Sequence, residues 1–335
     1  MAEYRYSMSE CDVKDRGKLE TFRAKRSEWV SWLKSGDPHS IWPQINQILW
    51  DDVLFRTIND LRREAIEHPA VGVGFNANVL RLLDAGFVTT QATAIRRLTD
   101  KPDGGRKRGV LSLRRLIKEI EENRGIITRE VYVAYDGLPY DPNAPWQAWI
   151  EKQIRDGTVA RTSWLPTTGP EAWGASEIVH KNFDRLAGVV PKARSRDDLI
   201  LLKWFEYLER RLTECDSVRK FVDKFIAHAA DPVSREGLTT EEKGVTLDHL
   251  RRAQKAIYQV AAFIYGPLLW EGSYGAVPTP QYDHLEYLDK SWLQTDRSAS
   301  AHEHWRQHLA EVEAWEQEGA WENANSNGGE RTIGA

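Results

Sequence analysis

Residues 216–235 read DSVRKFVDKFIAHAADPVSR, and they predict a short amphipathic helix that ends before Pro232. At about 100° per residue, one face collects the apolar side chains Val218, Phe221, Val222, Phe225 and Ala229. Lys224, His228 and Asp231 form a polar row at its edge, and Asp216 or Ser217 can cap the first turn. A helix with one apolar face needs a core, so the rest of the chain should supply helices that pack against it.

His228 falls in the last turn of this predicted helix, where the helix macrodipole favours the imidazolium form. An imidazole already titrates near neutral pH, so His228 is a candidate general acid or base. The alternative interpretation is structural, with His228 and Lys224 on the solvated flank of a core helix. The helix geometry alone leaves both interpretations open.

The chain is nearly neutral overall. Its 335 residues carry 46 basic and 50 acidic side chains, a formal charge of -4, so any nucleic-acid surface has to be local. The start MAEYRYSMSE lacks a secretion signal, and the longest apolar run, residues 261–270, is too short to cross a bilayer. We expect a soluble, cytoplasmic protein with no membrane contact. Cys11 and Cys215 are far apart, which predicts reduced thiols without a disulfide, and we expect no cofactor.

Helical spacing of apolar residues recurs along the chain, and no segment shows the sustained alternation of a strand, so the sequence predicts an all-α fold. The predicted helices cover residues 14–34, 43–66, 80–98, 113–123, 176–188, 195–212, 247–266, 284–293 and 299–315. The expected local signals are Pro43 at a first helical position, Gly86 as a potential break, N-caps at Ser112, Ser176 and Thr246, Ser195 opening a central helix, and stops at Gly188 and at Gly266-Pro267. The 14 scattered tryptophans predict packing anchors between these helices.

The breaks between the predicted helices suggest the domain organisation of the chain. We expect an N-terminal amphipathic helix in residues 1–38, a helical domain in 39–270, a peripheral helical extension in 271–320 and a disordered tail in 321–335. Residues 133–175 are rich in Pro, Gly and Trp. So long a connection is either a functional lid or an insertion packed over the bundle by its tryptophans.

The most basic part of the chain lies between residues 96 and 118. Its candidate nucleic-acid contacts are Arg96, Arg97, Arg106, Lys107, Arg108, Arg114 and Arg115. They predict either a phosphate-contacting patch or charges that serve solubility and helix ends. His180 and Asp184, four residues apart on one helix face, are candidate supporting residues. His302, His304 and His308 have spacing compatible with zinc, but no fourth ligand is identifiable, and we expect no metal site.

Five segments taken in order resemble the HEPN-like (higher eukaryotes and prokaryotes nucleotide-binding) domain of the type U abortive-infection proteins of bacteria. They are ATAIRRLTDK, VLSLRRLIKEI, HKNFDRLAG, DDLILLKWFEYLERRL and VDKFIAHAADPVSR, spread over roughly residues 45 to 265. The resemblance implies a HEPN-like helical bundle, usually dimeric. Many members of this superfamily are metal-independent RNases of phage defence or toxin–antitoxin pairs.

The superfamily signature is an Arg followed by a His after about four to six residues on one helix. His228 matches the histidine, but Phe221, Val222 and Asp223 occupy the positions of the arginine. Lys224 can supply a positive charge there, although without the bidentate fork of a guanidinium.

Two hypotheses follow from the resemblance. In the first, the chain is an RNase in which His228 is the general base or acid, Lys224 and Arg235 contact the phosphate, and Asp223 or Asp184 orients the catalytic groups. In the second, it is a non-catalytic module that binds nucleotide, RNA or a protein. Both include a homodimer, with an antitoxin or another defence-system protein as a potential partner.

Overall fold

The fold is known from a computed structural model that describes residues 4–67, 76–101, 109–156, 165–227, 230–239, 242–273, 275, 280–288, 290 and 298–317. Within these ranges the regular structure is helical, and the one β-type contact is an isolated bridge between Thr128 and Leu199. The predicted all-α class is confirmed. The chain divides into two compact units, Met1–Pro278 and Thr279–Ala335.

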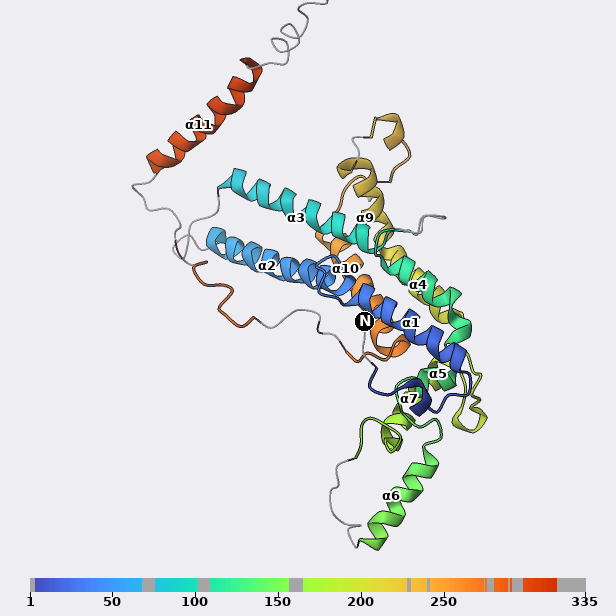
Figure 1. Cartoon of the computed structure of the whole chain (residues 1–335). Helices are drawn as coiled ribbons and strands as arrows, with labels where there is room; N and C mark the ends of the chain where they lie inside the picture. The colour runs from blue at the N-terminus through green and yellow to red at the C-terminus, as the bar shows by residue number, and fades with distance from the viewer. Residues whose placement is uncertain are drawn as a thin grey trace, which may run out of the picture. The chain divides into compact units, whose positions relative to one another are not determined.

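The first unit contains the main helices (Figure 1). They are α1 (Arg16–Leu33), α2 (Ile41–Glu67), α3 (Ala77–Leu98), α4 (Leu113–Glu122), α5 (Arg129–Ala134), α6 (Asn143–Arg155), α7 (Trp173–Ala187), α8 (Lys203–Leu212), α9 (Asp216–Phe221) and α10 (Leu247–Phe263). Two π turns extend α9 and α10, namely η5 (Val222–Ile226) and η7 (Ile264–Leu268). The second unit contains α11 (Ser298–Gln317).

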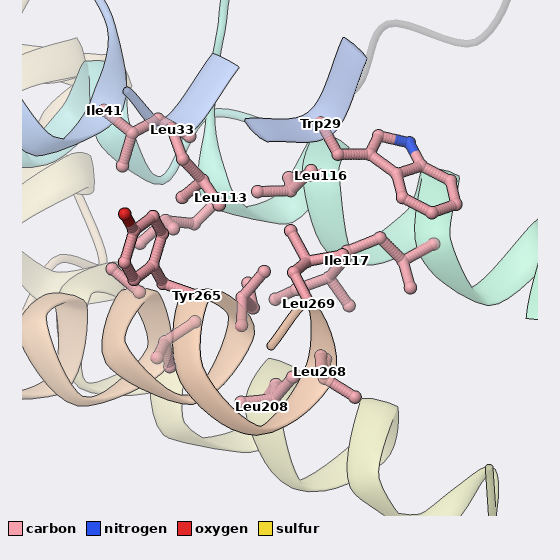
Figure 2. Packing of buried hydrophobic residues seen from close by; sticks show 14 of the residues in the cluster. Trp29, Leu33, Ile41, Leu113, Leu116, Ile117, Leu208, Tyr265, Leu268 and Leu269 are labelled. Atoms are coloured by element: carbon pink, nitrogen blue, oxygen red, sulfur yellow. The ribbon is translucent and has the colours of Figure 1, made fainter. Parts of the chain in front are cut away.

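Helix α10 packs against α2, α3, α4, α8 and α9, and it therefore runs through the middle of the bundle. Figure 2 shows the core where α1, α4, α8 and the turn η7 meet. The labelled side chains there are Trp29, Leu33, Ile41, Leu113, Leu116, Ile117, Leu208, Tyr265, Leu268 and Leu269, all buried. Trp29 and Trp42 are fully buried, as expected of packing anchors, whereas Trp305 of α11 is 70% exposed.

Several predicted helix signals are confirmed. The Ser112 hydroxyl accepts a hydrogen bond from the Arg115 N–H, and the Thr246 hydroxyl accepts one from the His249 N–H. Both therefore satisfy backbone donors that the first helical turn leaves free. Gly188 ends α7 with φ of 67°, in the left-handed region that glycine tolerates best.

Other boundaries differ from the prediction. Helix α3 is continuous through Gly86, and α7 begins at Trp173, so Ser176 lies inside it and donates its hydroxyl to the Pro139 carbonyl. Helix α2 begins at Ile41, two residues before Pro43. Residues 284–288 form turns instead of a helix.

The helix predicted from Ser195 begins only at Lys203. The preceding residues form a turn and an isolated bridge instead, and the carbonyls of Arg196 and Asp198 accept the N–H groups of Glu130 and Arg129. The predicted stop at Gly266-Pro267 was also wrong, since η7 carries the helix through Pro267 to Leu268.

The 133–175 segment contains a helix of its own, α6, which packs on α7. Trp149 of α6 and Trp173 of α7 have ring centroids 6.0 Å apart. This contact resembles the packing by tryptophans that the sequence suggested for an insertion.

Candidate nucleic-acid interface

The stretch that begins at Asp216 continues directly from α8. A single 3-10 turn, Thr213–Cys215, links α8 to α9, so Asp216 lies within a continuous helical run and does not cap it. Its carboxylate instead accepts a hydrogen bond from Arg114 Nη2 at 3.1 Å. Val218 and Val222 are buried in the core, which confirms the centre of the predicted apolar stripe.

From Val222 onward the helix widens into the π turn η5. The Ala227 N–H donates to the Val222 carbonyl at 2.8 Å, one residue further back than in an α-helix. The predicted row of Lys224, His228 and Asp231 assumed α-helical spacing, and this assumption does not hold across η5. Single π turns inserted into helices are frequent at functional sites.

An arginine from another helix reaches this turn. Arg96, in the last turn of α3, places Nε 2.6 Å from Asp223 Oδ1, and its Nη1 lies 3.8 Å from Asp100 Oδ2. The hydrogen bond to Asp223 raises the pKa of Arg96, so the guanidinium stays charged. Both side chains remain about one-third exposed, at 33% for Arg96 and 38% for Asp223. The packing of α3 on α9 and η5 brings them together (Figure 1).

We call Arg96, Asp223 and Lys224 the α3–α9 junction. Lys224 is half-buried, and no carboxylate among the described residues lies within ion-pair distance of its ammonium. His228 lies outside the described residues, so its predicted relation to Lys224 stays a prediction. The junction carries a guanidinium contributed by α3, and sequence spacing could not have found it because Arg96 and Asp223 are 127 residues apart.

The basic segment divides into residues with different surroundings. Arg114 is only 6% exposed, and it donates to Glu209 at 2.8 Å and to the Leu212 carbonyl at 3.1 Å, as well as to Asp216. It therefore ties α4 to α8 and α9, and its burial conflicts with the predicted phosphate contact.

Two further arginines of the segment remain at the surface. Arg115 stacks on the Trp32 ring, 4.4 Å from its centroid, and donates to the Gly109 carbonyl. Arg97 is exposed at the end of α3, where it lines a hollow of about 210 Å³ with His39, Gln44, Val110 and Leu111. The remaining candidates, Arg106, Lys107 and Arg108, lie outside the described residues.

A second, larger hollow of about 430 Å³ adjoins η5. Its lining residues are Phe225, Pro232, Arg235, Glu236 and Lys243. The rings of Phe225 and Phe221 stack with centroids 5.2 Å apart, and the Arg235 guanidinium carbon lies 5.7 Å from the Phe225 centroid. Arg235 is thus next to the aromatic stripe of the predicted site helix, but it reaches the hollow from the 3-10 turn Val233–Arg235.

His180 and Asp184 belong to a different cluster, built around the fully buried Arg129. Arg129 donates to Asp184 at 2.8 Å and to Asp198 at 2.7 Å, and Asp184 also accepts from Arg194 at 2.8 Å. His180 Nε2 lies 2.8 Å from the Tyr140 carbonyl. These contacts tie α7 to α5 and to the 194–198 segment. They do not place His180 or Asp184 at the α3–α9 junction.

The electrostatics of this cluster follow from its burial. Burial lowers the pKa of His180, and the neighbouring Arg194 and Arg129 act in the same direction against the hydrogen bond to Tyr140. Burial alone would raise the pKa of Asp184, but the hydrogen bonds from Arg194 and Arg129 outweigh it, and the pKa lies below its usual value. Neutral His180 and ionised Asp184 are the forms that the fold stabilises at neutral pH. Sequence reasoning missed Arg129 because nothing in its local sequence marks it as buried.

The potential metal ligands and the cysteines do not form a site among the described residues. Within the described ranges no three metal-ligating side chains come together, in α11 or elsewhere. Both cysteines are buried, and burial raises the pKa of Cys215 to about 12. In the part of the chain that the structure describes, no helix is both long and apolar enough to cross a bilayer.

Comparison of the chain with protein-family models, with curated proteins and with solved structures finds no match.

Proposed function

We propose that the chain is a HEPN-like RNase that cleaves RNA without a metal at the α3–α9 junction. The observation that carries the proposal is the contact between Arg96 and Asp223 at 2.6 Å. It brings a partly exposed guanidinium to Asp223, the chain neighbour of Lys224, on the stretch that resembles the HEPN site. A guanidinium and an ammonium can together stabilise the charge that builds on a phosphate during cleavage.

In the proposed reaction, His228 takes the proton of a ribose 2′-OH, and the 2′ oxygen attacks the adjacent phosphorus. The bond from phosphorus to the 5′ oxygen breaks, and the imidazolium returns the proton to that oxygen. The products are a 2′,3′-cyclic phosphate and a 5′-OH. Arg96 and Lys224 stabilise the phosphate oxygens, and Asp223 acts as a positioning residue that holds Arg96.

The experiment measures cleavage of single-stranded RNA in EDTA with the protein in excess. His228→Ala and Arg96→Ala should each lower the rate at least a hundredfold, because each removes a group that acts in the transition state. His304→Ala is the matched control, since His304 is exposed on α11, and it should cut like the wild type. The absence of cleavage by the wild type, or equal cleavage by His228→Ala, would contradict the proposal.

The same ion pair favours a second function, non-catalytic RNA binding. Asp223 compensates part of the Arg96 charge, and its carboxylate accepts the hydrogen bond from Arg96 Nε, so this donor is not available to a phosphate. A binding module would show RNA affinity that falls steeply with salt, with no strand scission at any protein concentration.

The resemblance also leads us to propose where the protein acts: as a homodimer in the bacterial cytoplasm, within a phage-defence or toxin-type system that includes an antitoxin or similar partner. Light scattering of the purified chain tests the dimer, and a monomer at all concentrations would refute it.

A further inference from the structure

The hollow lined by Phe225, Pro232, Arg235, Glu236 and Lys243 has the size and chemistry of a ligand site. Its volume of about 430 Å³ lies within the range of about 300–1,000 Å³ typical of small-molecule sites. The hollow beside Arg97, at about 210 Å³, lies below that range. The larger hollow, an open depression on the surface, is therefore big enough for a nucleotide.

Its lining combines an aromatic face with positive charge. Phe225 is half-buried and fixed by its stack on Phe221, so it offers a ring with little freedom left to lose. Arg235 lies over Phe225 and is held by a long hydrogen bond of 3.4 Å to the Asp231 carbonyl. So weak a bond lets the guanidinium move outward, which frees the Phe225 ring for an incoming base, since aromatic rings stack on unpaired RNA bases.

The charges at the rim favour a nucleotide over a bare anion. Arg235 and Lys243 can both reach a phosphate, but Glu236 lies on the same hollow and repels part of any anion that binds there. Stacking adds binding energy that an inorganic phosphate does not have. A duplex could not use the site, because its base faces are already stacked.

We propose that this hollow is a subsite for one unpaired nucleotide of single-stranded RNA, with the base on Phe225 and the phosphate on Arg235 and Lys243. The inference rests on the proposed function, and it extends it by naming the residues that would bind one unpaired base of the RNA. Phe225 follows Asp223 by two residues on the same π turn. Residues two apart on a helix do not face each other, so a strand bound at Phe225 has to cross η5 to reach the α3–α9 junction.

The test is fluorescence anisotropy in EDTA with a short labelled RNA, either single-stranded or as a duplex. A His228→Ala background prevents the proposed cleavage. The single strand should bind more tightly than the duplex, and Phe225→Leu should weaken it about tenfold, since stacking of one base on an aromatic ring contributes about 1–3 kcal/mol. Phe55→Leu is the matched control, because Phe55 is a half-buried ring stacked on Phe87 elsewhere in the bundle. It should bind like the parent protein.

The charged residues provide an independent readout that does not depend on a core ring. Arg235→Gln and Lys243→Gln should each reduce the slope of log affinity against log salt by about 0.7, whereas Lys255→Gln, an exposed lysine of α10, should leave it unchanged. Inorganic phosphate should compete only weakly. Equal binding of duplex and single strand, or unchanged affinity of a folded Phe225→Leu variant, would overturn the subsite.

The two proposals fail in different ways. Binding that depends on Phe225 without any cleavage by the wild type would refute the RNase and leave the subsite standing. Cleavage with a KM that Phe225→Leu does not change would refute the subsite and leave the RNase standing.

Discussion

Replacing the buried Arg129 with methionine should destabilise the fold strongly. The Arg129 side chain is fully buried, and it neutralises Asp184 and Asp198, whose side chains are only 12% and 14% exposed. Removing one partner of a buried ion pair typically costs about 3–5 kcal/mol, because a buried charge is left uncompensated. Here Asp184 keeps Arg194, and Asp198 keeps the Ser195 N–H at 3.0 Å. We therefore expect the lower end, about 3 kcal/mol.

The loss of unfolding free energy can be measured by urea unfolding of the full chain, with far-UV circular dichroism as the signal. The midpoint should fall while the slope with urea stays constant, which indicates a change in stability alone. Arg185→Met on the exposed side of α7 is the matched control, and it should change the free energy of unfolding by less than about 0.5 kcal/mol. If Arg129→Met costs no more than Arg185→Met, the account of the cluster is wrong.

Three further predictions concern single residues. Arg114→Gln should lower the free energy of unfolding by about 3 kcal/mol and leave the salt dependence of RNA binding unchanged, since Arg114 is paired inside the bundle; a changed salt slope would restore it as a phosphate contact. His180 has a pKa lowered from 6.5, so the unfolded chain binds more protons, and its contribution to stability is complete above pH 6.5 and lost as pH falls toward the folded-state pKa. His180→Asn should flatten the stability profile below pH 6.5, and an unchanged profile would refute the neutral buried histidine. Gly188→Ala should lower the melting temperature by several degrees, because its φ of 67° disfavours a Cβ and the new atom would meet Leu201 Cδ1 at 2.8 Å; an unchanged melting temperature would count against this packing.

The sequence predicted the helical class and most helix positions because those depend on local signals. Apolar spacing marked the buried faces, and the capping hydroxyls of Ser112 and Thr246 marked two helix starts. Errors arose where contacts between distant segments decided the backbone. The residues before Lys203 have helical spacing, yet carbonyls among them bond to the N–H groups of Arg129 and Glu130, and they form a turn and a bridge instead.

The candidate site shows the same division. Val218 and Val222 were predictable as core residues from their spacing alone. The Arg96–Asp223 contact was not predictable, because it depends on how α3 packs on α9. The sequence around either residue does not indicate that it contacts the other. The widening of the helix at η5 also leaves no clear sequence signal, so the α-helical spacing assumed for the stretch does not hold from Val222 to Ile226. The burial of Arg114 was hidden because Glu209 and Asp216, its acidic partners, come about one hundred residues later.

The chemistry of the RNA ends tests the central claim most directly. A 5′-labelled single-stranded RNA is incubated in EDTA with excess wild-type protein, beside the same RNA with a 2′-deoxy sugar at each mapped cleavage position. The account predicts fragments that end in a 2′,3′-cyclic phosphate from the first RNA, and no cleavage at the deoxy positions. Intact RNA, or equal cutting at the deoxy positions, would contradict it.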